Sequence, residues 1–206
     1  MPDIALFLAA SAVLTIAPGP DIICVLTRGV TQGRRAGIAA ALGFASGCIF
    51  HTFLAAAGIA ALIRSSEIAF DVVRYAGAAY LAWIGIQALR HRSSFSLQPT
   101  GEARSLATIY KQSVIGNMLN PKVTLFFLAF LPQFANVEAG HVGLQMALLG
   151  VIFMLQTIVI FGAVALCAGW IGAWMRRKPA IGERLNIFAG LAFIALGIRV
   201  ALPDVR

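Results

Sequence analysis

Residues 4–27 read IALFLAASAVLTIAPGPDIICVLT, an apolar run that contains the tetrapeptide Pro18-Gly19-Pro20-Asp21. A helix of about 20 residues crosses the hydrocarbon core of a bilayer, so this run is long enough to span a membrane. Proline has no backbone N–H, and its ring clashes with the carbonyl group four residues earlier. The stretch therefore predicts a membrane helix that is broken inside the bilayer, with the carboxylate of Asp21 at the break.

The composition of the whole chain also indicates a membrane protein. Of its 206 residues, 60% are hydrophobic and 12% are charged, whereas a soluble domain usually has about 25% charged residues. Long apolar runs predict six spans, approximately at residues 4–27, 37–63, 68–89, 113–135, 143–174 and 186–202. The predicted fold is thus an all-α polytopic membrane protein, with a single transmembrane domain over residues 1–206.

Two features of the ends concern processing and orientation. Ala10-Ser11-Ala12 resembles a signal-peptide cleavage site, but no Lys or Arg precedes it, so we expect the first span to be retained. Eleven Lys and Arg residues, Arg28 among them, follow the first, third and fifth spans, against four on the opposite side. The positive-inside rule then predicts cytoplasmic basic connections and both termini outside. The alternative, that these connections bind nucleic acid, is disfavoured because they contain few aromatic residues for base stacking.

The six spans divide into two groups of three. A Ser-, Pro- and Gly-containing segment at about residues 90–112 predicts a cytoplasmic linker between repeat 1 (about 1–89) and repeat 2 (about 113–206). An odd number of spans in each half gives the halves opposite orientations. Residues 76–82 and 189–195 also match in size and polarity, and both halves begin with a proline-interrupted span. We therefore expect inverted repeats, in which paired interruptions are typical of a binding site.

The second interruption is Asn120-Pro121-Lys122. By the same steric argument, the three prolines deprive the carbonyl groups of Leu14, Ile16 and Asn117 of their helical partners. Unpaired carbonyls inside a membrane are costly and can receive an ammonium group. The alternative is a kink that merely packs against neighbouring helices.

Charged and polar side chains inside the spans are candidates for a binding site. Asp21 and Lys122 are the acid and the base that lie well inside spans, where each charge is costly. They predict either a permanent ion pair between the halves or an acid that exchanges partners among Lys122, a proton and a substrate. Asn117 and Asn120 share a helix face and offer amide groups to a carboxylate or to the loosened backbone.

Other polar and small residues carry weaker signals. His51 and Gln156 are candidates for the cavity, and His51 is either a proton relay or, as we prefer, a neutral hydrogen-bonded interior histidine. Gly33 with Gly37 and Gly43 with Gly47 have the spacing of close helix packing. The three cysteines lack metal-ligand or disulfide spacing, so we expect neither a metal site nor a cofactor.

Together these segments resemble the LysE/RhtB family of bacterial inner-membrane amino-acid exporters. The resemblance is carried by Pro18-Gly19-Pro20-Asp21, by residues 32–37 (QGRRAG), by residues 75–85 (YAGAAYLAWIG), and by Asn117 with Asn120-Pro121-Lys122 leading into residues 126–134 (FFLAFLPQF). It implies efflux of an amino acid or a close derivative, driven by proton entry, and homo-oligomerisation.

The resulting hypothesis is a multi-pass transporter of the bacterial inner membrane. We expect a substrate ammonium group at Asp21 and at the carbonyls freed by Pro18 and Pro20, and a substrate carboxylate at Lys122 and Asn120. Gly19, Pro121 and Asn117 complete the predicted site. The competing hypotheses are an intramembrane enzyme or redox protein, for which Ser46 and His51 are poorly spaced, and a membrane protein with a purely structural role.

Overall fold

The computed structural model describes residues 4–59, 67–90, 103–136, 139–178 and 180–202. Within these ranges the chain is helical and contains no strand. The first half contains α1 (Ile4–Ile16), α2 (Pro20–Thr31), α3 (Arg34–Phe53), the π-helical η1 (Leu54–Ile59) and α5 (Glu67–Arg90). The second half contains α6 (Leu106–Met118), α7 (Pro121–Leu125), the π-helical η2 (Phe126–Phe130), the 3₁₀-helical η3 (Leu131–Phe134), α8 (Val142–Leu166), α9 (Ala168–Arg177) and α10 (Ala180–Ala201).

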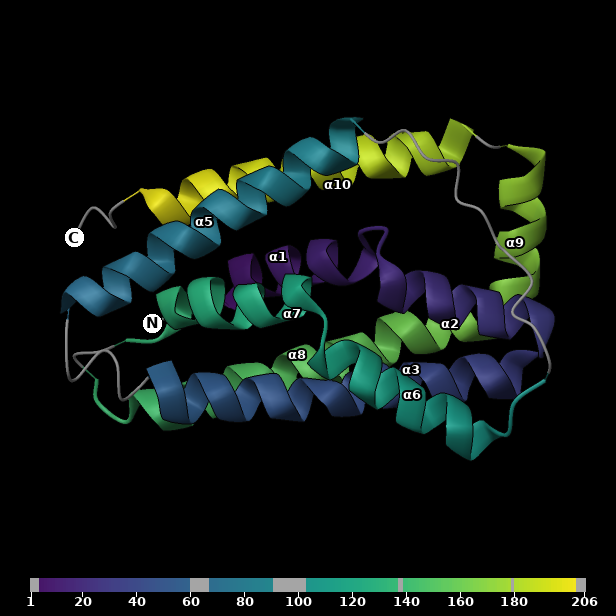
Figure 1. Ribbon diagram of the computed structural model, residues 1–206, viewed down its shortest axis with the longest axis horizontal. Coiled ribbons are helices and arrows are strands. Elements are labelled where there is room, and N and C mark those ends of the chain that lie inside the picture. Colours follow the sequence, from purple (N-terminus) through teal and green to yellow (C-terminus); the bar gives the residue numbers. More distant parts are fainter. Residues whose placement is uncertain (1–3, 60–66, 91–102, 137–138, 179, 203–206) are drawn as a thin grey trace.

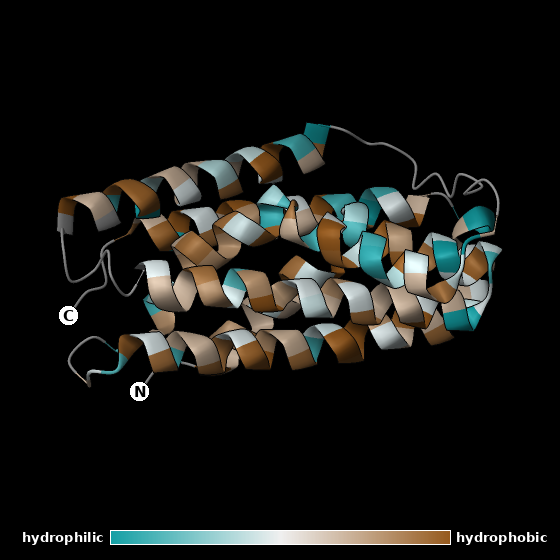
Figure 2. Cartoon of the chain, turned by 60° about the horizontal axis from the view of Figure 1, so that its bottom comes forward, coloured by the Kyte–Doolittle hydropathy of each residue, from teal (hydrophilic) through white to brown (hydrophobic). Residues whose placement is uncertain are grey.

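The described helices account for four to six membrane spans. Four segments are long and apolar enough to cross a membrane by themselves: Arg34–Gly58, Asp71–Arg90, Val142–Leu166 and Ala180–Ala201. Two further spans arise if each bent pair, α1 with α2 and α6 with α7, counts as one. Figure 2 shows that apolar residues dominate these helices, as expected for surfaces that face lipid.

Both predicted interruptions are present. The axes of α1 and α2 differ by 58°, and the extended residue Gly19 joins them before Pro20 begins α2. Proline is favoured at the first position of a helix because no partner is needed there for the missing N–H. The segment from Leu106 to Met118 meets the segment from Pro121 to Phe134 at 47°. Here the side chain of Asn120 accepts a hydrogen bond from the backbone N–H of Lys122 at 3.0 Å and so caps α7.

Three predicted boundaries differ from the structure. The fifth span, predicted at 143–174, ends at Leu166, and α9 sets off at the end of the bundle in a different direction (Figure 1). The predicted linker at 90–112 contains the first turns of α6, which begins at Leu106 after an N-cap by Ser105. The last helix begins at Ala180 rather than at about 186. Residues 60–63 of the second predicted span and 91–102 of the linker lie outside the described residues.

The helices pack as close pairs. α5 lies along α10, and α3 contacts both α6 and α8. Glycines permit these approaches: a Cβ atom at Gly43 would lie 2.5 Å from the backbone oxygen of Tyr110 in α6, and one at Gly85 would lie 2.6 Å from that of Gly190 in α10. The packing role expected for Gly33 is wrong. Its φ of +88° serves the turn before α3, and its missing Cβ faces open space.

Two apolar clusters pack around the breaks. The larger one contains Phe7, Phe126, Phe127, Phe130, Phe134 and Phe153 among its buried members. The smaller one contains Ile22, Val25, Ile109 and several alanines around the edge-to-face pair Phe44 and Phe161. The second cluster lies toward the end of the bundle where α2 ends and α3 begins (Figure 1). Residues at the breaks themselves, among them Leu14, Ala17 and Val123, belong to the larger cluster.

Candidate functional site

Asp21 lies at the second position of α2 with only 4% of its surface exposed. Its Oδ2 accepts a hydrogen bond from Nδ2 of Asn117 at 3.0 Å, and its Oδ1 accepts one from Nδ2 of Asn120 at 2.8 Å. A negative charge is favoured near a helix N-terminus, and hydrogen bonds from two amides stabilise it further. Asp21 therefore joins the break of one half to the break of the other.

Lys122 completes the connection in the opposite direction. Its amine donates to the backbone oxygen of Leu14 at 3.0 Å and to that of Ala17 at 3.4 Å, at the C-terminal end of α1. It also lies 6.0 Å from the centre of the Phe193 ring, within cation–π distance. Gly19 leaves room for the amine, because a Cβ atom there would lie 2.9 Å from Lys122 Nζ. The carbonyl freed by Pro18 thus has a lysine partner.

Asp21 and Lys122 do not form the permanent ion pair that the sequence left open. No distance of 4.0 Å or less joins the amine to the carboxylate of these two described residues. Both nevertheless line one small cavity, together with Leu14, Thr15, Cys48, Asn117, Val123, Phe153, Thr157 and Phe161. The cavity is small, because the centre of a water molecule can occupy only about 10 Å³ of it. Room for about one water remains, so an amino acid enters only if the surrounding helices move apart.

His51 acts on the second break through the backbone. The imidazole is fully buried, and its Nε2 lies 2.9 Å from the backbone oxygen of Asn117, the carbonyl freed by Pro121. Since a carbonyl oxygen only accepts, Nε2 carries the proton in this contact. The backbone N–H of Asn120 reaches the same oxygen at 2.9 Å. His51 is therefore a hydrogen-bonded interior histidine, as preferred above, and does not line the cavity around Asp21.

The predicted cavity residue Gln156 lies elsewhere. Its Oε1 accepts a hydrogen bond from the hydroxyl of Ser11 at 3.0 Å, and its Nε2 donates to the backbone oxygen of Leu8 at 3.3 Å. Both partners belong to α1, so Gln156 holds α8 against α1 and does not line the cavity around Asp21. Its position on an apolar span did not distinguish these two roles.

Sequence reasoning missed two hydroxyl groups and one thiol in the lining. Thr15 and Thr157 line the cavity while each hydroxyl donates to the carbonyl group four residues earlier, at 2.8 and 2.9 Å. The thiol of Cys48 lies beside them in the same wall. Threonine inside apolar spans was the available signal, but this local bonding gives the same sequence pattern at packing positions.

Arg28 is the clearest departure from expectation. The sequence placed it in a basic connection after the first span, yet it belongs to α2 and is only 8% exposed. Its Nη1 atom is buried and has no hydrogen-bond partner in the described structure. The broken span continues to Thr31, so Arg28 lies inside the bundle, about two turns after Asp21 on the same face of α2.

Comparisons with known proteins agree with this architecture. A curated protein of Vibrio cholerae serotype O1, named an uncharacterized membrane protein, is 33% identical over 95% of this chain and 94% of its own length. A homoserine/homoserine lactone efflux protein of Salmonella typhimurium is 30% identical over 95% of this chain and 94% of its own length. A leucine efflux protein of an Enterobacter species is 31% identical over 91% of this chain and 90% of its own length.

No solved structure matches the chain. The family model described as LysE type translocator matches residues 12–203, which includes both breaks and all six predicted spans but the first few residues. Such translocators are transporters rather than enzymes, so the intramembrane enzyme considered from the sequence is excluded. The chain is a multi-pass bacterial membrane protein and belongs to the LysE type translocator family.

Proposed function

We propose that this protein exports an amino acid or a close derivative across the bacterial inner membrane in exchange for protons. The observation that carries the proposal is the hydrogen bonding of Asp21, whose two carboxylate oxygens are held by Asn117 and Asn120 across two broken helices. A buried carboxylate between broken membrane helices is a recurrent arrangement for solute and ion sites. The efflux proteins named above are similar over nearly the whole chain, which supports the direction of transport.

Substrate recognition is an exchange of partners in this proposal. The ammonium group of the substrate donates to Asp21 and replaces the amide groups there. The amides of Asn117 and Asn120, together with the amine of Lys122, then become donors for the substrate carboxylate. Because these same groups connect the two breaks in the empty protein, substrate binding loosens the connection and allows the halves to move.

Proton coupling follows from the single buried acid in the cavity wall. One carboxylate binds either a substrate ammonium group or a proton, so the two compete for Asp21. The substrate leaves outward, and a proton occupies Asp21 during the return step. This competition predicts an exchange ratio near one for one.

The helix pairing supports an inverted repeat as the moving architecture. If the broken spans correspond, α3 corresponds to α8 and α5 to α10, and each of these helices contacts its counterpart. Contacts between corresponding helices are expected when a two-fold axis relates the two halves. The same relation puts the beginning of α1 and the end of α10 on one side, and the surplus of basic residues on the other connections favours that side as the outer one.

Export from proteoliposomes tests the proposal. Vesicles are preloaded with radiolabelled amino acids of several classes, and efflux is measured with and without an imposed pH gradient. We expect efflux of at least one class to accelerate when the gradient drives protons inward. Overexpression in cells should also confer resistance to toxic amino-acid analogues that remain chemically unchanged. Absence of both effects would favour the remaining alternative, a membrane protein with a structural role.

A further inference from the structure

A second group of buried donors lies toward the end of α2, outside the cavity around Asp21. Arg28 is 8% exposed, and its Nη1 atom is buried with no partner in the described residues. Gln32 follows one helical turn later, and its Nε2 atom is likewise buried without a partner there. The side-chain oxygen of Gln32 is already used, since it accepts the backbone N–H of Arg104 at 3.3 Å. Two neighbouring N–H groups therefore lack an acceptor.

The charge of the described interior also lacks a counterpart near Arg28. Asp21 is the buried acid in these residues, and its two oxygens are bonded to Asn117 and Asn120. A buried guanidinium without a nearby anion is strongly unfavourable. Its planar fork matches a carboxylate in shape and hydrogen-bond direction. The geometry of this side chain therefore suits an anion with two acceptor oxygens.

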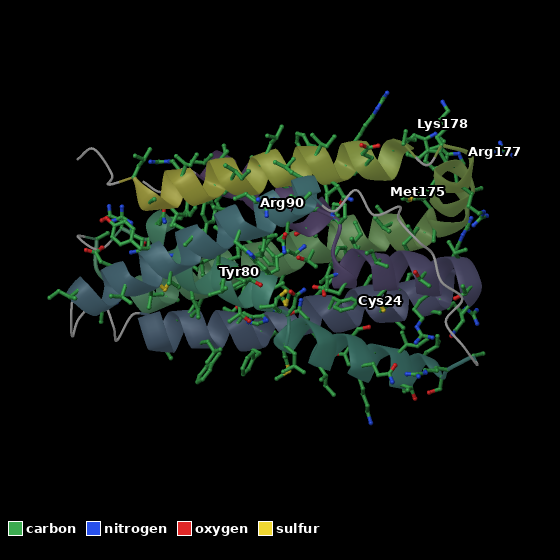
Figure 3. The ribbon with its side chains drawn as sticks, turned by 45° about the horizontal axis from the view of Figure 1, so that its top comes forward. Cys24, Tyr80, Arg90, Met175, Arg177 and Lys178 are labelled. Atoms are coloured by element: carbon green, nitrogen blue, oxygen red, sulfur yellow. The ribbon has the colours of Figure 1, made fainter. Side chains whose placement is uncertain are left out.

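A line of polar groups connects this position to the cavity. Arg28 lies seven residues after Asp21, about 10 Å along the helix at 1.5 Å per residue, and on the same face. Cys24, labelled in Figure 3, lies between them along α2 and next to both Arg28 and Ser113. Ser113 is buried on α6, one turn from Asn117. Arg28 thus lies at the start of a polar strip that ends at Asp21.

We propose that Arg28 and Gln32 form a recruiting site that binds the carboxylate of the substrate before its ammonium group reaches Asp21. This inference rests on the export function proposed above, and it places the first contact at the end of the bundle where α2 ends and α3 begins. Substrates must then carry a free carboxylate to enter efficiently. The apolar pair Phe44 and Phe161 packs edge to face in the cluster next to α2, and Phe161 also lines the cavity around Asp21.

The test is transport kinetics of the full protein with paired substrates. For Arg28→Gln we expect the half-saturating concentration of a transported amino acid to rise about tenfold or more, the effect of losing one charge-assisted hydrogen bond. The half-saturating concentration of the methyl ester of the same amino acid should change less than threefold. Substrate is titrated on each face of oriented vesicles, and the rise should be confined to the face at the α2 end. Arg28→Lys, which keeps the charge but loses the fork, should give an intermediate value.

The matched control is Arg35→Gln, which removes an exposed positive charge at the beginning of α3, at the same end of the bundle. This variant should leave the half-saturating concentrations of both the amino acid and its ester unchanged. Equal losses for the amino acid and its ester, or an equal rise on both faces, would overturn the recruiting site. A defect that appears only in vesicles containing anionic lipid would also overturn it, because the anion would then be a lipid headgroup. If the unmodified protein transports no amino acid at all, the export function itself fails.

Discussion

The two broken spans both contain freed backbone groups, but they contribute charged side chains of opposite sign. The break between α1 and α2 contributes an acid at the start of a helix and exposes carbonyl groups at the end of the preceding one. The break between α6 and α7 contributes amide donors and an amine. The amine of Lys122 lies near the N-terminus of its own helix, where a positive charge is unfavourable, but at the C-terminus of α1, where it is favourable. Each break is thus stabilised by the charged residue of the other.

This difference explains why the protein tolerates two broken helices in one small bundle. Freed backbone groups cost several kcal/mol each in a membrane interior if they remain unpaired. Here the carbonyl oxygen of Leu14 accepts a hydrogen bond from Lys122, and that of Asn117 accepts one from His51. The carboxylate of Asp21 accepts hydrogen bonds from two amides. In the proposed mechanism a zwitterion replaces these same bonds. Stability and recognition would then depend on the same few atoms, and substitutions on the two sides of the connection should differ in kind.

The largest expected effect is that of Asp21→Asn. The substitution keeps the size of the side chain but removes the negative charge, so proton-coupled export should be abolished while the protein remains inserted. The measurement is substrate counterflow and its pH dependence in proteoliposomes. Asp71→Asn is the matched control, because Asp71 is a more exposed acid on α5 that pairs with Arg74 at 3.6 Å. Normal counterflow with normal pH dependence in Asp21→Asn would refute the assignment.

Lys122→Met tests the other side of the connection. The variant retains a long apolar stem but removes the amine, so the carbonyl groups of Leu14 and Ala17 lose their partner. We expect affinity for substrates with a free carboxylate to fall about tenfold, the order of one charge-assisted hydrogen bond, and affinity for the corresponding decarboxylated amines to fall less. Competition assays with both compounds measure this ratio. A ratio of one would make Lys122 structural and leave Asp21 as the only recognition group of the pair.

Gly47→Ala disturbs the connection without touching a charged group. The added Cβ atom would lie 2.6 Å from Cβ and 2.7 Å from Oδ1 of Asn117, so the amide must move away from Asp21. Overpacking of this kind costs about 1–3 kcal/mol. We expect a lower midpoint of thermal unfolding in detergent and weaker substrate binding. Gly162→Ala is the control, because a Cβ atom there meets no other atom within 4 Å. Similar behaviour of the two variants would show that Asn117 need not stay in place.

His51→Leu should have the smallest effect of the four. It removes one hydrogen bond to the backbone oxygen of Asn117, but the N–H of Asn120 still reaches that oxygen. The expected loss is about 1 kcal/mol of stability, with export still dependent on the pH gradient. Thermal unfolding and gradient-driven efflux measure the two quantities separately. If His51→Leu lost its coupling to protons while keeping its stability, the histidine would be a proton relay after all.

The sequence predicted the class of fold and the positions of both breaks, because hydropathy and proline act over a few residues. Spans of about 20 apolar residues and the missing N–H of Pro18, Pro20 and Pro121 need no knowledge of neighbouring helices. Asp21, Lys122, Asn117 and Asn120 stood out for a similar reason, since polar groups are costly in any membrane helix. The end of the fifth span was wrong, because no proline or charge marks the turn at Cys167.

Partner choice was beyond the sequence, because hydrogen bonds form between atoms that are near in space and distant along the chain. The amides were expected to bind a substrate carboxylate or the loosened backbone. In the structure their Nδ2 groups bind Asp21, nearly 100 positions earlier, while Oδ1 of Asn120 accepts the backbone N–H of Lys122 at the break. Gln156 was expected in the cavity and instead holds α8 against α1. Arg28 was counted as a loop charge, since its burial depends on helices that pack around α2. Local sequence determined which groups are costly inside a membrane, and only the packing of the helices decided which of them pair and which atoms of the described residues, such as Arg28 Nη1, have no partner.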